Sequence, residues 1–255
     1  MWQDIKMLNA TANALFGLVA LALVAAFLWW VAQLPYFTLK VIRIEGTQQQ
    51  PLRHINPLTV RSAALTHIRG NFFTANLDTV RQAFESVPWV RKATVRREWP
   101  NQLTVTLEEH LPLGTWGDDG KLLSTKGDVF VVNLAEAEED ARLLEFSGPV
   151  GSEKEVVARL ADLNDWFAPL GLSVESLDLS DRYAWSMKLN NGITVELGRE
   201  KSSTTLKERV DRLVGIYPQL VERLQNRIEN IDMRYPNGLA LKAQGLTAGL
   251  DSRKK

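Results

Sequence analysis

Residues 87–112 read VPWVRKATVRREWPNQLTVTLEEHLP, and the pattern of this segment organises the region around it. Apolar and polar side chains alternate on both sides of residues 99–102, and a period of two is typical of a half-buried strand. We therefore expect two antiparallel strands joined by a turn at 99–102. On their shared apolar face, we expect Ala93 and Val95 to lie opposite Leu103, Val105 and Leu107.

Upstream of this hairpin the sequence predicts one strand and two amphipathic helices. Residues 37–45 are apolar and β-branched, as in a strand. Residues 56–70 begin with Asn-Pro and end with Gly, which are typical helix start and stop signals, and a second helix is expected over 76–87 before a proline. The resulting order is β-α-α-β-β, so residues 37–110 are expected to form a small α+β domain.

Further upstream, the 19 residues from Ala14 to Ala32 carry no polar side chain. As a helix they span roughly 28 Å, which is close to the hydrocarbon thickness of a bilayer. A cleavable signal peptide would have a shorter apolar core and small residues before the cut, where this chain has Trp30. A buried core helix would show a polar stripe. We therefore expect a transmembrane helix over 14–34 after a short tail, 1–13, although the flanking charges do not decide its orientation.

Downstream of the hairpin, residues 111–243 are expected to form a second, mostly antiparallel β-domain with two helices. Capping boxes at Ser152–Glu155 and Thr205–Glu208 predict the two helix starts. The strongest hairpin signal is the alternation on both sides of Asn190-Asn-Gly192. A last hairpin is expected over 231–241, and the acidic residues 136–140 are expected to form a loop. The polar residues 244–255 are expected to be disordered.

Composition and motifs nominate no catalytic residue, cofactor or metal ligand. The chain has no cysteine, and its three histidines are far apart in sequence. Asp118-Asp119 precedes a glycine in a turn, so we interpret it as a solvated loop, and Glu108 with His110 as the wet end of a strand. Residues 37–110 carry 10 Lys and Arg against 6 Asp and Glu, which is too mild an excess for nucleic-acid binding. The first hairpin also carries a local basic cluster: Arg91, Lys92, Arg96 and Arg97. Such a cluster is usually a solvated strand face, and the alternative is a surface that docks an acidic partner or lipid headgroups.

Three sets of motifs, taken in order, carry a family resemblance. The first is GNFFTANL at 70–77, followed by residues 87–112 and Trp116. The second is LLSTKGDVF at 122–130 with FSGP at 146–149, and the third is LNNGITVELGR at 189–199 with IDMRYPNGLA at 231–240. On these motifs the chain resembles the FtsQ/DivIB family of bacterial cell-division proteins, and residues 37–110 resemble the POTRA (polypeptide-transport-associated) domain of that family.

This resemblance implies an orientation and a role. The N-terminus would lie in the cytoplasm, with a single span in the cell inner membrane and the two domains in the periplasm at the division septum. The family is not enzymatic and needs no cofactor. It joins the division machinery by binding FtsB and FtsL, and the resemblance extends the partners to FtsK, FtsW and FtsI. It also implies control of septal peptidoglycan synthesis, without nucleic acid or small-molecule substrate.

The resemblance places the partner-binding site on the last strands. An exposed strand edge accepts a partner strand through unpaired backbone groups, and aromatic and Arg side chains dominate binding energies. We expect the contacts to come from Met233, Arg234, Tyr235, Asn237, Gly238, Leu239 and Leu241, with Arg234 and Tyr235 as anchors; Met233 and Tyr235 could equally be core residues. Some family members have an aromatic residue where this chain has Lys242-Ala243.

Two other functions stay open at this stage. The chain could be a POTRA-bearing module of a secretion or outer-membrane assembly system, although residues 111–255 show neither a repeat nor the length of a barrel. It could also be a membrane-tethered hydrolase, which would require carboxylates that converge in a cleft.

Overall fold

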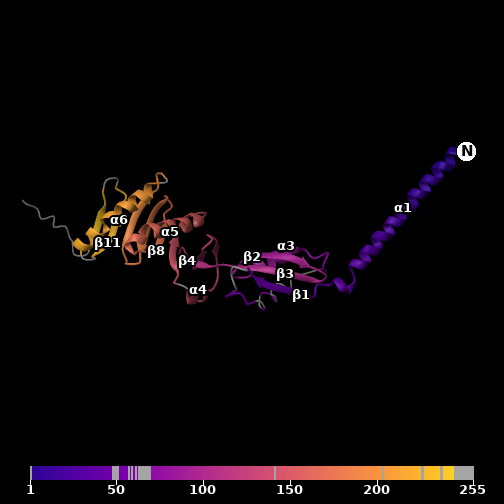
Figure 1. The fold of residues 1–255 in the computed structure, drawn as a ribbon, viewed down its shortest axis with the longest axis horizontal. Coiled ribbons are helices and arrows are strands. Elements are labelled where there is room, and N and C mark those ends of the chain that lie inside the picture. Colours follow the sequence, from indigo (N-terminus) through magenta and orange to yellow (C-terminus); the bar gives the residue numbers. More distant parts are fainter. Residues whose placement is uncertain are drawn as a thin grey trace, which may run out of the picture. The chain divides into compact units, whose positions relative to one another are not determined.

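The computed structural model describes the chain in two compact units, Met1–Glu109 and His110–Lys255 (Figure 1). The described residues are 2–47, 52–56, 58, 60, 62, 70–140, 142–202, 204–224, 227–235 and 238–243. The helix predicted over 56–70 and the tail predicted over 244–255 therefore lie largely or wholly outside the described residues.

The first unit begins with a long apolar helix, α1 (Trp2–Ala32). Its segment Asn9–Ala32 is 24 residues long, has a mean hydropathy of 2.4 and is not buried by the rest of the protein. This helix is long and apolar enough to cross a membrane, and it fits a single-pass membrane protein.

A short 3-10 helix, η1 (Pro35–Phe37), follows α1 directly. The strand predicted from Phe37 begins only at Val41, so its predicted start was wrong. The reason is local: the N–H of Phe37 donates to the carbonyl of Leu34 at 3.0 Å, and Pro35 has the fixed φ that suits the first turn of a helix.

Three strands form the sheet of the first unit: β1 (Val41–Gly46), β2 (Val90–Glu98) and β3 (Gln102–Glu109). Their order is β1-β3-β2. The predicted hairpin is present, with Ala93 opposite Leu107 and Val95 opposite Val105. Strand β1 runs parallel to β3 in an unbroken register, from Val41 opposite Gln102 to Gly46 opposite Leu107.

Helix α3 (Leu77–Glu85) packs on this sheet and begins where the sequence predicts. The side-chain oxygen of Asn76 accepts the N–H groups of Asp78 and Thr79, so it caps the helix. Val80 and Phe84 point into the core and are buried.

A buried carboxylate at the end of β3 is a feature that the sequence did not predict. Glu109 is 5% exposed. Its two oxygens accept the backbone N–H groups of Arg53, His54 and Ile55 at distances of 2.9, 2.7 and 3.0 Å. Three donors satisfy the buried charge, and they fix the segment 53–55 to the last strand of the unit.

The second unit is built on one nine-stranded sheet of order β12-β11-β10-β9-β8-β7-β4-β5-β6. Three of its pairings are parallel, namely β4 with β7, β7 with β8, and β10 with β11. The strands are β4 (Pro112–Trp116), β5 (Lys121–Ser124), β6 (Val129–Phe130), β7 (Leu144–Ser147), β8 (Val174–Leu179), β9 (Ala184–Leu189), β10 (Thr194–Arg199), β11 (Ile228–Asp232) and β12 (Ala240–Ala243).

Two long helices, α5 (Glu153–Phe167) and α6 (Thr205–Leu224), pack on this sheet. A 3-10 turn, η2 (Ala168–Leu170), follows α5 and ends at Gly171 with φ +66°. Apolar residues of both helices meet those of β8, β9 and β10 in one core; its largest fully buried members are Trp185, Phe167, Leu123, Leu163, Leu177, Leu179, Leu189 and Leu197. The alternate residues of these strands are polar and lie on the other face of the sheet.

Two local predictions for this unit were wrong. Residues 136–140 lie within a helix, α4 (Leu134–Asp140), rather than in a loop; the N–H of Ala135 donates to the side chain of Asn133 at its start. Ser152 precedes α5 but forms no capping box, because its hydroxyl instead donates to the carbonyl of Pro149 at 2.6 Å. Helix α6 begins at Thr205, close to the predicted start, and continues through Pro218. Thr205 does not form the predicted capping box, because its N–H donates to the carbonyl of Ser202 at 3.0 Å and its hydroxyl accepts the N–H of Ser202 at 3.0 Å.

Candidate partner-binding site

The candidate site lies at one end of the large sheet. Strand β11 is held between β10, to which it is parallel, and β12, to which it is antiparallel. Within the described residues β12 is the outermost strand at this end. Its far edge therefore presents backbone donors and acceptors to which another strand could add.

The predicted contact residues fall into different environments. Met233 is fully buried in the core, and its N–H donates to the carbonyl of Glu196 at 2.8 Å. Its side chain is therefore part of the core and does not reach the surface. Tyr235 is 55% exposed, and its carbonyl accepts a hydrogen bond from Arg212 at 3.3 Å.

On β12 and the approach to it, the apolar side chains are partly accessible. Leu239 packs against the core at its edge, and Leu241 is 37% exposed. Gly238 is half-buried. Asn237 lies outside the described residues.

Arg234 is exposed and forms a two-pronged ion pair with Asp232. Its Nη2 lies 2.6 Å from Asp232 Oδ2, and its Nε lies 2.9 Å from Oδ1. These hydrogen bonds hold the pKa of the Asp232 carboxyl below its usual value, and the carboxylate raises the pKa of Arg234.

Gly198 leaves room for the aliphatic part of the Arg234 side chain. It has φ +74° beside a bulge in β10, and a Cβ on it would lie 2.8 Å from Arg234 Cγ. Only glycine lets the arginine cross the strand so closely.

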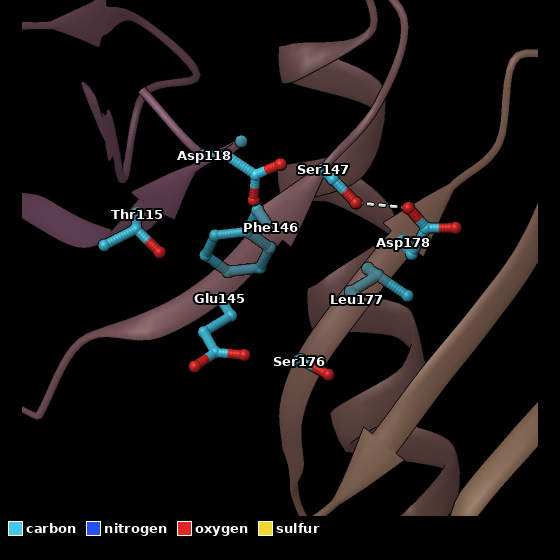
Figure 2. Close-up of a pocket in the computed structure, with 9 residues that line it drawn as sticks. Thr115, Asp118, Glu145, Phe146, Ser147, Ser176, Leu177 and Asp178 are labelled. Atoms are coloured by element: carbon cyan, nitrogen blue, oxygen red, sulfur yellow. Dashed lines mark hydrogen bonds between the residues drawn. The ribbon is translucent and has the colours of Figure 1, made fainter. Parts of the chain in front are cut away.

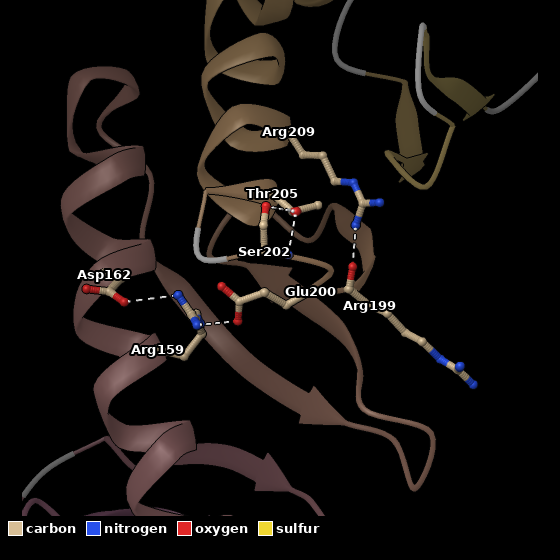
Figure 3. A network of polar contacts seen from close by, with 7 residues as sticks. All are labelled: Arg159, Asp162, Arg199, Glu200, Ser202, Thr205 and Arg209. Carbon is tan, nitrogen blue, oxygen red and sulfur yellow. Dashed lines mark hydrogen bonds and ion pairs between the residues drawn. The ribbon is translucent and has the colours of Figure 1, made fainter.

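Arg234 also lines a cavity of about 360 Å³ with four other cationic side chains. We call it the basic cavity; it is lined by Ser180, Arg182, Ala184, Gly198, Arg199, Lys201, Arg209 and Arg234. Arg209 extends from α6 and donates to the carbonyl of Arg199 at 2.9 Å (Figure 3). It also donates to the carbonyl of Leu197 at 2.5 Å. Burial and the nearby Arg212 lower the pKa of Arg209. Among the described residues that line it none is acidic, so the cavity would attract a carboxylate.

A second arginine stabilises the wall of this region. Arg159 on α5 donates to Asp162 at 3.1 Å and to Glu200 at 2.7 Å, so it joins α5 to the segment after β10 (Figure 3). Its guanidinium also lies 5.6 Å from the ring centre of Trp185. The sequence alone does not reveal the contacts of Arg159 or the basic cavity, because the residues involved come from separate strands and helices.

The four basic residues predicted as a recruitment surface do not form one patch. Lys92 and Arg96 share a face of β2 opposite Glu108 and Thr104. Arg97 lies on the other face and donates to the carbonyl of Ala75 at 2.7 Å. Arg91, beside a bulge, forms a 3.0 Å ion pair with Glu108. Lys92 and Arg96 are therefore the two that present charge together.

A second cavity, of about 390 Å³, is acidic and lies by β4, β7 and β8 (Figure 2). Asp118, Glu145 and Asp178 line it. The hydroxyls of Ser147 and Ser186 both donate to Asp178. Each oxygen of that carboxylate therefore already accepts a hydrogen bond. Within the part of the chain that the structure describes, no three His, Asp or Glu side chains are grouped to hold a metal ion.

The Asp232–Arg234 pair leads to a prediction about pH. In the Arg234→Ala variant we expect the pKa of Asp232 to rise toward the normal range, because the largest cause of its depression is removed. A depressed pKa stabilises the folded state above the unfolded-state value of about 3.9, and this stabilisation is lost as the pH falls through the lower folded-state pKa. A carboxyl NMR titration of both proteins measures the shift; an unchanged midpoint would contradict the ion pair.

Comparisons with known proteins agree with this architecture. A model of the family described as "Cell division protein FtsQ/DivIB, C-terminal" matches residues 114–234, and one described as "POTRA domain, FtsQ-type" matches residues 37–110. The Cell division protein FtsQ of Burkholderia pseudomallei is 50% identical over 254 residues, which cover 100% of this chain and 99% of that protein. That of Bordetella pertussis is 42% identical, covering 94% and 92%. The chain therefore belongs to the FtsQ/DivIB family of cell division proteins.

Proposed function

We propose that this protein is a non-enzymatic scaffold of the division machinery, anchored in the inner membrane by α1 and binding FtsB- and FtsL-type partners through its second unit. In this proposal residues 1–13 are cytoplasmic, 14–34 span the membrane, and the POTRA domain (37–110) and β-domain (111–243) are periplasmic. Family membership and the apolar helix α1 support the proposal.

The observation that carries the binding site is the combination of an open strand edge with the basic cavity. Strand β12 offers backbone groups, Tyr235 offers an exposed aromatic ring, and Arg234 lines the cavity. A partner that adds an extended segment to β12 and places carboxylates near Arg234 would satisfy all three. Backbone pairing would supply affinity, and the charges would supply register and specificity.

Depletion of the protein from growing cells tests the proposed role. We expect filaments without septa, because the late division proteins would no longer be recruited and septal peptidoglycan synthesis would not start. Cells that divide normally after depletion would contradict the proposal.

The same cells test the site through two truncated chains. A chain that ends at Gly238 lacks β12, whereas a chain that ends at Ala243 keeps it and serves as the matched control. We expect only the longer chain to restore septa and to copurify with an FtsB-type partner. Thermal unfolding of both chains shows whether the sheet survives the loss of its outer strand. Restoration of septa by the shorter chain would refute the β12 site, but it would not contradict the proposed role as a membrane-anchored scaffold.

A further inference from the structure

Five aromatic residues from three separate segments meet at one end of the first unit. Phe37 is central, with its ring centre 5.0 Å from that of Phe73 and 5.5 Å from that of Trp99. Phe72 lies 5.5 Å from Trp99 and 5.3 Å from Phe73, and Tyr36 lies 5.3 Å from Phe37. We call Tyr36, Phe37, Phe72, Phe73 and Trp99 the aromatic cluster.

The aromatic cluster is open to solvent although its rings pack on one another. Trp99 is 64% exposed, Tyr36 60% and Phe73 48%. Large exposed apolar patches on a protein mark surfaces that bind another protein or a membrane. Val80, Phe84, Leu103, Val105 and Leu107 of the same unit are, by contrast, almost completely buried.

Hydrogen bonds fix the aromatic cluster next to the end of α1. Helix η1, which contains Tyr36 and Phe37, begins three residues after Ala32. The side-chain amide of Asn71 donates to the carbonyl of Ala32 at 2.7 Å. The N–H of Phe72 donates to the carbonyl of Phe37 at 2.9 Å. The cluster is therefore continuous with the helix that is apolar enough to cross a membrane.

The chemistry of this surface matches the interface of a bilayer. Trp and Tyr rings are enriched at the headgroup level because they combine an apolar body with a polar tip. Trp29 and Trp30 are exposed on the last turn of α1, at the same end. Lys40 is exposed as well, and its N–H donates to the carbonyl of Asn101, two residues after Trp99. A cation at this place suits phosphate headgroups.

We propose that the aromatic cluster inserts into the headgroup region of the membrane that α1 spans, so that the POTRA domain is docked on the lipid surface instead of being suspended from a free linker. The proposal rests on the membrane anchoring proposed above. It assigns Phe73 and Trp99, which are 26 residues apart in the chain, to one lipid-binding surface.

Single-cysteine labelling tests the docking in the full chain, since the natural sequence has no cysteine that must be removed. Trp99→Cys and Phe73→Cys each carry a nitroxide in vesicles of phosphatidylcholine and phosphatidylglycerol. Ser86→Cys is the aqueous control, because Ser86 is exposed and follows the C-terminal end of α3, whereas Phe73 precedes its N-terminal end. Leu21→Cys in α1 is the lipid control. The measurement is the collision rate with oxygen, which concentrates in lipid, relative to that with a water-soluble nickel chelate.

We expect the oxygen-to-nickel ratio at positions 73 and 99 to be severalfold higher than at Ser86 and below that at Leu21. Ratios equal to that at Ser86 would overturn the docking, while a lipid value at Leu21 would leave the anchor itself in place. Low collision rates with both reagents at 73 and 99 would overturn it as well, because they would show a surface covered by protein. An aqueous value at Leu21 would contradict both the anchor and the docking. Tyr36→Cys provides a third site if either substitution prevents folding.

Discussion

Replacement of Tyr235 by alanine is expected to weaken the binding of an FtsB-type partner by roughly 30-fold, which corresponds to about 2 kcal/mol. The ring is 55% exposed beside the outer strand β12, so a partner strand that adds to β12 would bury it. Aromatic residues that become buried at the centre of an interface are the ones whose truncation costs most. The free energy of unfolding should change little, because the ring contributes little to the core.

Val131 is a control for this experiment. It is 68% exposed in the same unit, but it follows β6, which lies at the opposite end of the strand order from β12. Titration calorimetry with the partner's periplasmic segment should show the loss for Tyr235→Ala and not for Val131→Ala. Equal affinities of both variants, with both folded, would remove Tyr235 from the site.

The largest effect on stability is expected from Gly114→Ala on β4. A Cβ at this position would lie 2.1 Å from the carbonyl oxygen of Leu144 and 2.7 Å from the ring of Phe146. Backbone atoms of the neighbouring parallel strand cannot move aside without breaking the pairing of β4 with β7. We expect a loss of about 3 kcal/mol in the free energy of unfolding, at the upper end of the usual cost of overpacking.

Gly215→Ala supplies the opposite case in the same unit. Gly215 lies within α6, and a Cβ there meets nothing within 4 Å. Alanine is the better helix former, so this variant should be more stable by about 0.5–1 kcal/mol. Denaturant unfolding of the two variants in parallel checks the sign of both changes in the free energy of unfolding. A neutral Gly114→Ala would show that β4 and β7 are not held at this spacing.

The sequence predicted best those elements that depend on neighbours in the chain. The hairpins around residues 99–102 and 190–192 and the approximate starts of α3 and α6 follow from local alternation and turn residues. The fold class and the family were confirmed. The antiparallel pairing of β11 with β12 is also present, but β11 ends at Asp232, so Arg234 and Tyr235 lie just beyond the strand.

What the sequence did not reveal depends on contacts between distant segments. The parallel pairings of β4, β7 and β8 join strands separated by long connections, and no local pattern specifies a parallel neighbour. The cationic side chains of the basic cavity come from positions 182 to 234, and each of them resembles an ordinary surface cation in the sequence. The burial of Glu109 has no local signal in the sequence, because its three donors lie more than 50 residues earlier.

The parallel register of β1 and β3 has a mechanical consequence. The membrane-side connection enters the first unit at the start of β1, and the second unit is joined at the end of β3. Tension between the two attachments would therefore pull these neighbours lengthwise past each other, and it would load all the pairs from Val41–Gln102 to Gly46–Leu107 at once. Hydrogen bonds that share a load must break together, whereas a hairpin pulled at its open end unzips one pair at a time. The pairing of β1 with β3 should therefore resist a pull applied between α1 and the second unit more strongly than a hairpin pulled at its open end would.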